Sequence, residues 1–130
     1  MKGKRRGKKL QPPFAFTLET LTLTEKAIQL FKLPLQRADH RDAKVIFAKE
    51  MIQRIQEKLA TMKQSVGLMC LVSFDYNEKI LLIQALRLYS IALLSLPRNA
   101  RQAREIRQCQ RIAAYFEAEN ARAAPRRLND

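Results

Sequence analysis

Apolar residues between positions 42 and 64 recur at alternating steps of three and four. They are Val45, Ala48, Ile52, Ile55, Leu59 and Met62. This spacing places all six on one side of an α-helix and predicts a helix over residues 42–64. The repeat covers about two and a half heptads, whereas an independent coiled coil is typically longer. We therefore expect this helix to pack within a helical bundle.

A second segment, residues 76–95, is apolar on nearly every side of a helix. Its large apolar residues are Ile80, Leu81, Leu82, Ile83, Leu86, Leu88, Ile91, Leu93 and Leu94. Asp75 and Glu78 have the spacing of a capping box, in which both side chains accept free backbone N–H groups at a helix start. A helix that is apolar all round must be covered all round. We expect it to be either the central helix of the domain or part of a subunit interface.

Residues 99–118 predict an amphipathic helix that follows a turn marked by Pro97 and Asn99. At about 100° per residue, one side collects apolar residues: Ile106, Cys109, Ile112, Ala113 and Phe116. Arg104, Arg107 and Arg111 point in nearly the opposite direction, and Arg101 lies on the shoulder between the two sides. This helix therefore has one face for the core and one cationic face for solvent or a ligand.

The pattern before residue 34 is less regular. Residues 24–33 predict a short helix that Thr24 caps and that ends before Pro34, because proline disfavours helical backbone in the preceding residue. In residues 14–23, alternating apolar positions and several threonines favour a short β element, although Phe14, Leu18 and Leu21 also fit one helical face. The apolar run 68–74 is a short strand, a buried connector or an early start of the next helix.

These patterns predict a mostly α protein, a compact bundle of three to four helices. A chain of 130 residues predicts one domain. We place the helices at about 24–33, 42–64, 76–95 and 99–118, with a short β element at 14–23, at 68–74 or at both. We place the domain at 14–120, between a disordered basic arm (1–13) and a flexible basic tail (121–130), since like charges repel and prolines interrupt helices.

The formal net charge of +13 is concentrated at the two ends of the chain. Residues 1–9 contain six cations and no acid, and residues 98–130 contain eight arginines and four acids. Residues 10–97 contain eleven cations and eight acids, which is close to balance. Such a distribution indicates an anionic partner: phosphate groups, an anionic membrane or an acidic protein surface.

The basic face of the last helix is the strongest candidate for a binding surface. The planar guanidinium group of arginine presents several donors to phosphate oxygens and keeps its charge at neutral pH. We assign phosphate contacts to two sets of residues: Arg101, Arg104, Arg107 and Arg111 on the helix, and Lys4, Arg5, Arg6, Lys8 and Lys9 in the arm. A helix-turn-helix formed by the last two helices is an alternative, but the exposed side has few base-reading side chains. We therefore expect backbone contacts with little sequence specificity.

Catalytic and metal-binding motifs are missing from the sequence. His40, Cys70 and Cys109 are its whole inventory of histidine and cysteine, and none has a neighbour at ligand spacing, so we expect no metal and no cofactor. Asp39 and Asp42 stand at a helix start, where the helix dipole favours acids. We expect a protein that is not an enzyme and whose two cysteines are buried free thiols.

The longest apolar region, residues 80–96, contains polar interruptions and is shorter than the ~20 residues of a membrane span. The basic N-terminus lacks the apolar run of a signal peptide. We expect a cytoplasmic protein, or a nuclear one in a eukaryotic host.

Three functions fit this sequence. The first is non-enzymatic binding to the backbone of DNA or RNA, as an accessory subunit of a nucleoprotein complex. The alternative is a protein–protein assembly module whose apolar helix 76–95 forms a subunit interface, through self-association or with another protein. The third is peripheral binding to an anionic membrane.

Overall fold

The computed structural model describes residues 16–64 and 73–123. These residues form four helices and no strand: α2 (Leu18–Gln36), α3 (Ala43–Gln64), α4 (Tyr76–Leu94) and α5 (Ala100–Ala123). The prediction of a compact, mostly α bundle is confirmed.

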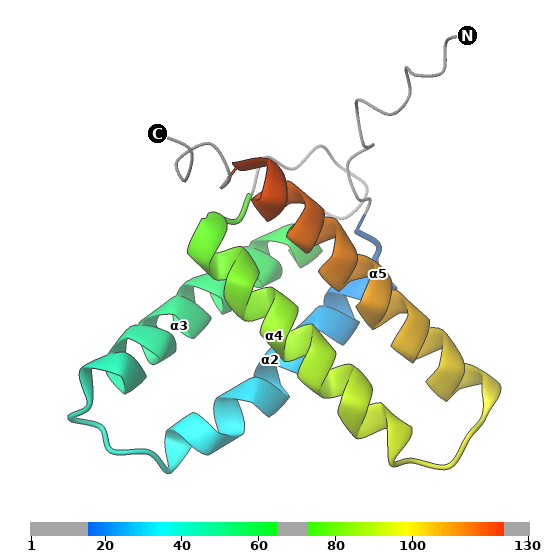
Figure 1. Cartoon of the computed structure of the whole chain (residues 1–130), viewed down its shortest axis with the longest axis horizontal. Coiled ribbons are helices and arrows are strands. Elements are labelled where there is room, and N and C mark those ends of the chain that lie inside the picture. The colour runs from blue at the N-terminus through cyan, green and yellow to red at the C-terminus, as the bar shows by residue number, and fades with distance from the viewer. Residues whose placement is uncertain (1–15, 65–72, 124–130) are drawn as a thin grey trace, which may run out of the picture.

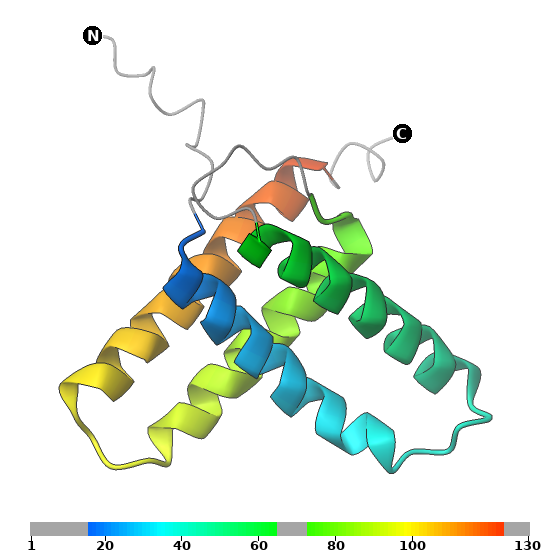
Figure 2. The same cartoon turned by 180° about the vertical axis from the view of Figure 1, so that it is seen from behind.

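The four helices are arranged as two antiparallel hairpins that cross each other (Figure 1). One hairpin is α2 with α3, and the other is α4 with α5. Their crossing point is the contact of α2 with α4, and Figure 2 shows the same crossing from behind. Beyond it the hairpins diverge, so that the α2–α3 connection and the α4–α5 connection point away from each other.

The first described helix begins earlier than its sequence suggested. Thr17 is the N-cap: its Oγ1 accepts the N–H of Thr20 (3.1 Å), and the Thr20 Oγ1 accepts the N–H of Thr17 (2.8 Å). Thr24, our predicted cap, lies inside the helix and donates its hydroxyl to the Thr20 carbonyl (2.8 Å). Such back-bonding satisfies threonine hydroxyls within a helix. The β element predicted for 14–23 is therefore wrong for residues 18–23, and Phe14 and Ala15 lie outside the described residues.

The same helix also continues past the predicted end at Leu33. Pro34 lies inside α2, in its last turn and two residues before its end at Gln36. A proline removes one intrahelical hydrogen bond and its ring crowds the preceding turn, so it ends or kinks a helix, and α2 ends two residues after it. The carbonyl of Pro34 accepts the N–H of Arg37 (3.2 Å), and this bond closes the helix.

The other three helices match their predicted positions closely. α3 follows Asp42, whose Oδ1 accepts the N–H of Lys44 (2.8 Å). α4 begins at the predicted capping box of Asp75 and Glu78. α5 begins after Asn99, whose Oδ1 accepts the N–H of Gln102 (2.8 Å), and it continues through Ala123. Residues 121–123, which we assigned to the tail, are therefore helical. The rest of that tail, the arm and residues 68–72 lie outside the described residues, and Ser73 and Phe74 form no strand.

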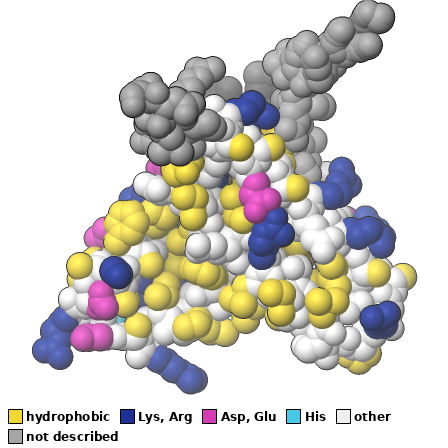
Figure 3. All heavy atoms as spheres, viewed as in Figure 1, with side chains coloured by type: hydrophobic (Ala, Val, Ile, Leu, Met, Phe, Trp, Pro, Cys, Tyr) yellow, Lys and Arg dark blue, Asp and Glu magenta, His cyan; other side chains and the backbone are white. Residues whose placement is uncertain are grey.

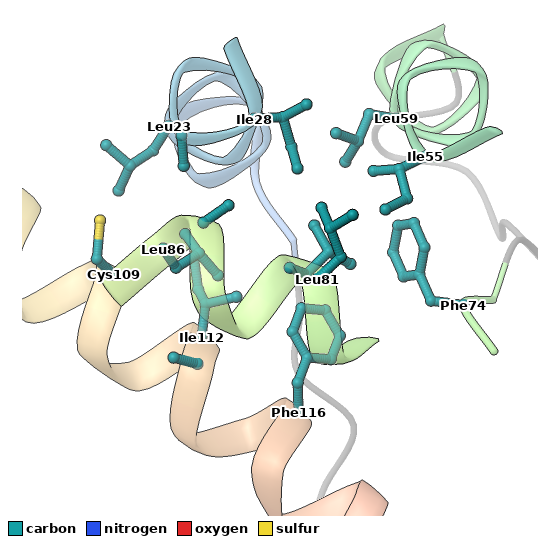
Figure 4. Close-up of a cluster of buried hydrophobic side chains, with 14 of the residues drawn as sticks. Leu23, Ile28, Ile55, Leu59, Phe74, Leu81, Leu86, Cys109, Ile112 and Phe116 are labelled. Carbon is teal, nitrogen blue, oxygen red and sulfur yellow. The ribbon is translucent and has the colours of Figure 1, made fainter. Parts of the chain in front are cut away.

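The hydrophobic core lies where the two hairpins cross (Figure 4). Each helix contributes fully buried apolar side chains, including Ile28 of α2, Ile55 of α3, Leu86 of α4 and Ile112 of α5. The aromatic rings of Phe74 and Phe116 pack edge to face, with centroids 5.8 Å apart. Burial of each large apolar side chain contributes about 1.5–3 kcal/mol, so this core, shared by all four helices, stabilises the two hairpins against each other.

A buried carboxylate links the two hairpins. Glu78 of α4 is only 1% exposed, and its oxygens accept hydrogen bonds from Lys58 Nζ (2.6 Å) and Arg54 Nε (3.3 Å) of α3. Burial alone would raise the pKa of Glu78, but the hydrogen bonds from Lys58, the Asp75 amide and Arg54 outweigh it and lower the pKa. Glu78 thus caps α4 and joins it to α3 through one ionised group.

Candidate nucleic-acid interface

The predicted cationic face of α5 is present on the outside of the molecule. Arg101, Arg104, Arg107 and Arg111 are all exposed, and we call them the arginine row. Figure 3 shows lysine and arginine side chains along the right-hand edge of the molecule, where α5 lies. The opposite side of the helix is buried in the core through Cys109, Ile112, Ala113 and Phe116, as its apolar spacing predicted.

Two acids of α5 are directed away from this row. Glu117 forms an ion pair with Arg87 of α4 through two hydrogen bonds, the shorter at 2.6 Å. Glu119 pairs with Lys79 of α4 (3.0 Å) and accepts the hydroxyl of Tyr115 (2.7 Å). Burial raises the pKa of Glu119, but Tyr115, Lys79 and the charge of Arg122 together lower it. Because these two carboxylates are paired with cations of α4, they do not neutralise the arginine row.

The arginines of the row differ in their partners. Arg101 lies 3.5 Å from Glu105, one turn away, and Arg104 lies 2.8 Å from Glu19 of α2. The side chains of Arg101 and Arg104 are 80% and 61% exposed, and such surface pairs contribute only about 0–1 kcal/mol. A phosphate can therefore replace either carboxylate at low cost. Within residues 16–64 and 73–123, Arg107 and Arg111 have no carboxylate partner.

An open groove of 840 Å³ lies beside the row, between α2 and α5. Its lining includes Arg101 and Arg104, with Glu19, Glu105 and the additional cation Lys26 of α2. Lys26 was not among the predicted phosphate contacts. Its helical spacing placed it on the polar side of α2, but no sequence signal placed that side next to α5.

The remaining predicted phosphate contacts belong to the basic arm. Lys4, Arg5, Arg6, Lys8 and Lys9 lie outside the described residues. The alternative of a helix-turn-helix is not supported, because α4 and α5 run antiparallel along each other in Figures 1 and 2. A helix-turn-helix instead joins two helices at about 90–120°.

The side chain of Cys109 is a free thiol buried in the core. Burial, with a smaller contribution from the charge of Glu105, raises the pKa of Cys109 to about 12. His40 is exposed between α2 and α3, and its Nδ1 lies 2.6 Å from Lys49 Nζ. His40 therefore lies at the surface, whereas the Cys109 thiol is enclosed in the core. Cys70 lies outside the described residues.

The described part of the chain contains no cluster of three or more histidine, cysteine, aspartate or glutamate side chains able to hold a metal ion. Nor does any helix in it have the length and apolar character required to cross a bilayer.

Comparison with known proteins found no matching family model, no matching curated protein and no matching solved structure.

Proposed function

We propose that this chain is a non-enzymatic, basic helical protein that binds the phosphate backbone of DNA or RNA with little sequence specificity. In this proposal it is an accessory subunit of a nucleoprotein complex, in the cytoplasm or in the nucleus of a eukaryotic host. The observation that supports it is the distribution of charge on α5. Glu117 and Glu119 are paired with α4, whereas the outer face carries four exposed arginines.

The length of the arginine row suits a short stretch of nucleic-acid backbone. Arg101 and Arg111 are ten residues apart, which corresponds to about 15 Å along the helix axis. Duplex DNA rises about 3.4 Å per base pair, so the row runs beside about four base pairs. Four guanidinium groups over this length match about four phosphates of one strand. The cations of the arm at Lys4, Arg5, Arg6, Lys8 and Lys9 then extend the contact.

The side chains around the row favour backbone contact over base reading. Positions on the same side of α5 include Ala100, Ala114 and Ala118, which have no hydrogen-bonding groups in their side chains, and one amide, Gln108, in the groove beside Arg101 and Arg104. Sequence is read by polar or methyl contacts at base edges, whereas phosphate contacts only position the protein. The same small side chains disfavour a membrane as the partner of this face, since an interfacial helix inserts bulky apolar residues.

The test is the salt dependence of binding, measured by fluorescence anisotropy with labelled duplexes of two unrelated sequences. We expect similar affinities for both sequences and a linear fall of log K with log salt concentration. Replacing Arg101, Arg104, Arg107 and Arg111 by glutamine should lower the magnitude of the slope by about 3.6, because each lost phosphate contact contributes about 0.9.

A matched control removes the same amount of charge from the other hairpin. It replaces Lys32, Arg37, Arg41 and Lys44, near the α2–α3 connection, by glutamine. If both variants lose the same affinity and slope, net charge rather than the arginine row controls binding. If the unaltered chain does not bind either duplex, or single-stranded RNA, at about 50 mM salt, the proposed function is wrong.

A further inference from the structure

The groove between α2 and α5 has a lining that phosphate contacts alone do not explain. One face of each helix forms a wall: Glu19 and Lys26 belong to α2, and Arg101, Arg104 and Glu105 belong to α5. Figure 2 shows the first turns of α2, in blue, beside α5. The lining thus holds three cations and two carboxylates. A surface that binds only phosphate gains nothing from carboxylates, because like charges repel.

Glu105 is the carboxylate whose contacts are incomplete. Its side chain is only 18% exposed, and its one ion pair within residues 16–64 and 73–123 is with Arg101 Nε, at 3.5 Å. It accepts no hydrogen bond from those residues, whereas Glu19 accepts one from Arg104 Nη2 at 2.8 Å. An ionised carboxylate can accept about four hydrogen bonds, and leaving them unmade in a mostly buried site is unfavourable. An N–H donor that enters the groove therefore gains a charge-assisted hydrogen bond to Glu105.

The charges around Glu105 restrict the kind of donor that fits. Arg101 and Arg104 lie on the same helix, and Lys26, an exposed ammonium group with no ion pair among the described residues, lines the other wall. With cations in excess, the lining repels a cationic donor. A neutral donor that is linked to an anion satisfies both kinds of group. A nucleotide has this composition, because adenine, cytosine and guanine carry neutral amino groups and each nucleotide carries a phosphate.

Glu105 also lies deeper than the arginines beside it. The side chains of Arg101 and Arg104 are 80% and 61% exposed, against 18% for Glu105. A base that is stacked and paired in a duplex does not reach such a recessed group, whereas an unpaired base of a single strand can be splayed out. Leu18, which is 55% exposed and lines the groove, offers apolar surface to the face of such a base.

We propose that the groove binds one unpaired nucleotide of a single strand, whose base amino group donates to Glu105 while its phosphates lie against Arg101 and Lys26. This inference rests on the proposed function, because the same strand lies along the arginine row. A phosphate that replaces Glu105 as the partner of Arg101 leaves the carboxylate unpaired, and the amino group then supplies the missing donor. Duplexes still bind through their backbone alone, with little sequence specificity.

Cytosine and thymine provide a matched comparison for this contact. Their rings are of the same size, but cytosine has an N4 amino donor where thymine has the O4 acceptor. A thymine in the groove therefore makes no hydrogen bond from this position to Glu105 and places a second acceptor beside it. Because a specific contact to a base edge discriminates by at least about fivefold, we expect oligo(dC) to bind at least about fivefold more tightly than oligo(dT).

The test is fluorescence anisotropy of the full chain with labelled oligo(dC) and oligo(dT) of about twelve nucleotides and with a labelled duplex of mixed sequence. Glu105→Gln keeps the size of the side chain but removes its charge. The two single strands should then bind within about twofold of each other. Affinity for the duplex should stay the same or rise, because a negative charge beside the arginine row is lost.

Glu117→Gln is the matched control. It also removes one carboxylate from α5, but the partner of Glu117 is Arg87, and neither residue lines the groove. This variant should keep the full preference for oligo(dC). Circular dichroism verifies that both variants are folded.

The outcomes separate this inference from the proposed function. Equal affinities of the unaltered chain for oligo(dC) and oligo(dT), together with salt-dependent binding of the duplex, would overturn the inference and leave the proposed function intact. A folded Glu105→Gln variant that keeps the preference for oligo(dC) would also overturn it. Failure to bind any of the three would overturn both. If deoxycytidine monophosphate at about 1 mM displaces oligo(dC), the groove binds free nucleotides and its assignment to a strand is wrong.

Discussion

Replacing Glu78 by glutamine tests how the two hairpins are held together. Glutamine keeps the size of the side chain and an oxygen that can accept the N–H of Asp75, but it removes the charge that faces Lys58 and Arg54. A hydrogen bond to a charged group contributes about 1.5–3 kcal/mol. Lys58 and Arg54 are themselves a third to a half exposed, so water partly replaces the lost carboxylate.

We therefore expect Glu78→Gln to lower the free energy of unfolding by about 1–2 kcal/mol at pH 7. For a chain of this size the melting temperature should fall by about 4–8 °C. Glu117→Gln is the matched control, because it removes one carboxylate from an ion pair between two half-exposed side chains. Its cost should stay below about 1 kcal/mol.

The effect of Glu78→Gln should depend on pH in a defined direction. The pKa of Glu78 is lowered in the folded protein, so its ionised form favours folding. This contribution is fully present above the unfolded pKa of about 4.3 and is lost as the pH falls through the lower folded pKa. The difference in stability between the unaltered chain and Glu78→Gln should therefore narrow from pH 7 to about pH 3.

The assay is urea unfolding followed by circular dichroism at about pH 7, 5 and 3. Glu119 also has a lowered pKa, but it is present in both proteins and cancels in the comparison. Equal unfolding midpoints at pH 7, or a difference that does not change with pH, would refute the assignment of Glu78 as an ionised link between α3 and α4.

Two further predictions concern single residues. Thr17→Ala removes the side-chain cap of α2 and should lower the free energy of unfolding, measured in urea, by about 0.5–2 kcal/mol. The control is Thr61→Ala, which changes an exposed threonine inside α3 and should lower it by less. Equal losses would contradict the capping role of Thr17. In a Cys70→Ser variant, buried Cys109, with a pKa of about 12, should react with a thiol reagent only as fast as the protein unfolds. Rapid labelling in native buffer would show that this thiol is accessible.

Much of the helical structure follows from local rules. Residues Asp75 and Glu78 predict the start of α4, since a capping box uses only neighbouring backbone groups. The seam of Ile52, Ile55 and Leu59 predicts α3 and the side that it buries, because period and burial are related by helix geometry. The start of α2 at Leu18 was not predicted because threonine is compatible with both strands and helix starts. Its branched side chain favours strands, but its hydroxyl also caps helices and bonds back within them.

The candidate surface was only partly predictable. The separation of the arginine row from Cys109 and Ile112 follows from about 100° per residue. The partner of Arg104 does not, because Glu19 lies 85 residues away in the sequence. Arg54 is a similar case: Glu50 lies one turn earlier on the same helix, but Arg54 pairs with buried Glu78 of α4. The carboxylate with which an arginine forms an ion pair therefore depends on how the helices cross.

The sequence by itself determined three of the four helices, the buried faces of α3 and α5 and the cationic side of α5, because these depend on spacing along a single helix. Only the tertiary structure decided that α2 passes across α4, that Glu78 becomes the buried link between the hairpins, and that Leu88, Ile91 and Leu94 stay uncovered. The physical reason is that the spacing of apolar residues shows which side of a helix is buried. Which element packs against that side depends on segments far apart in the chain.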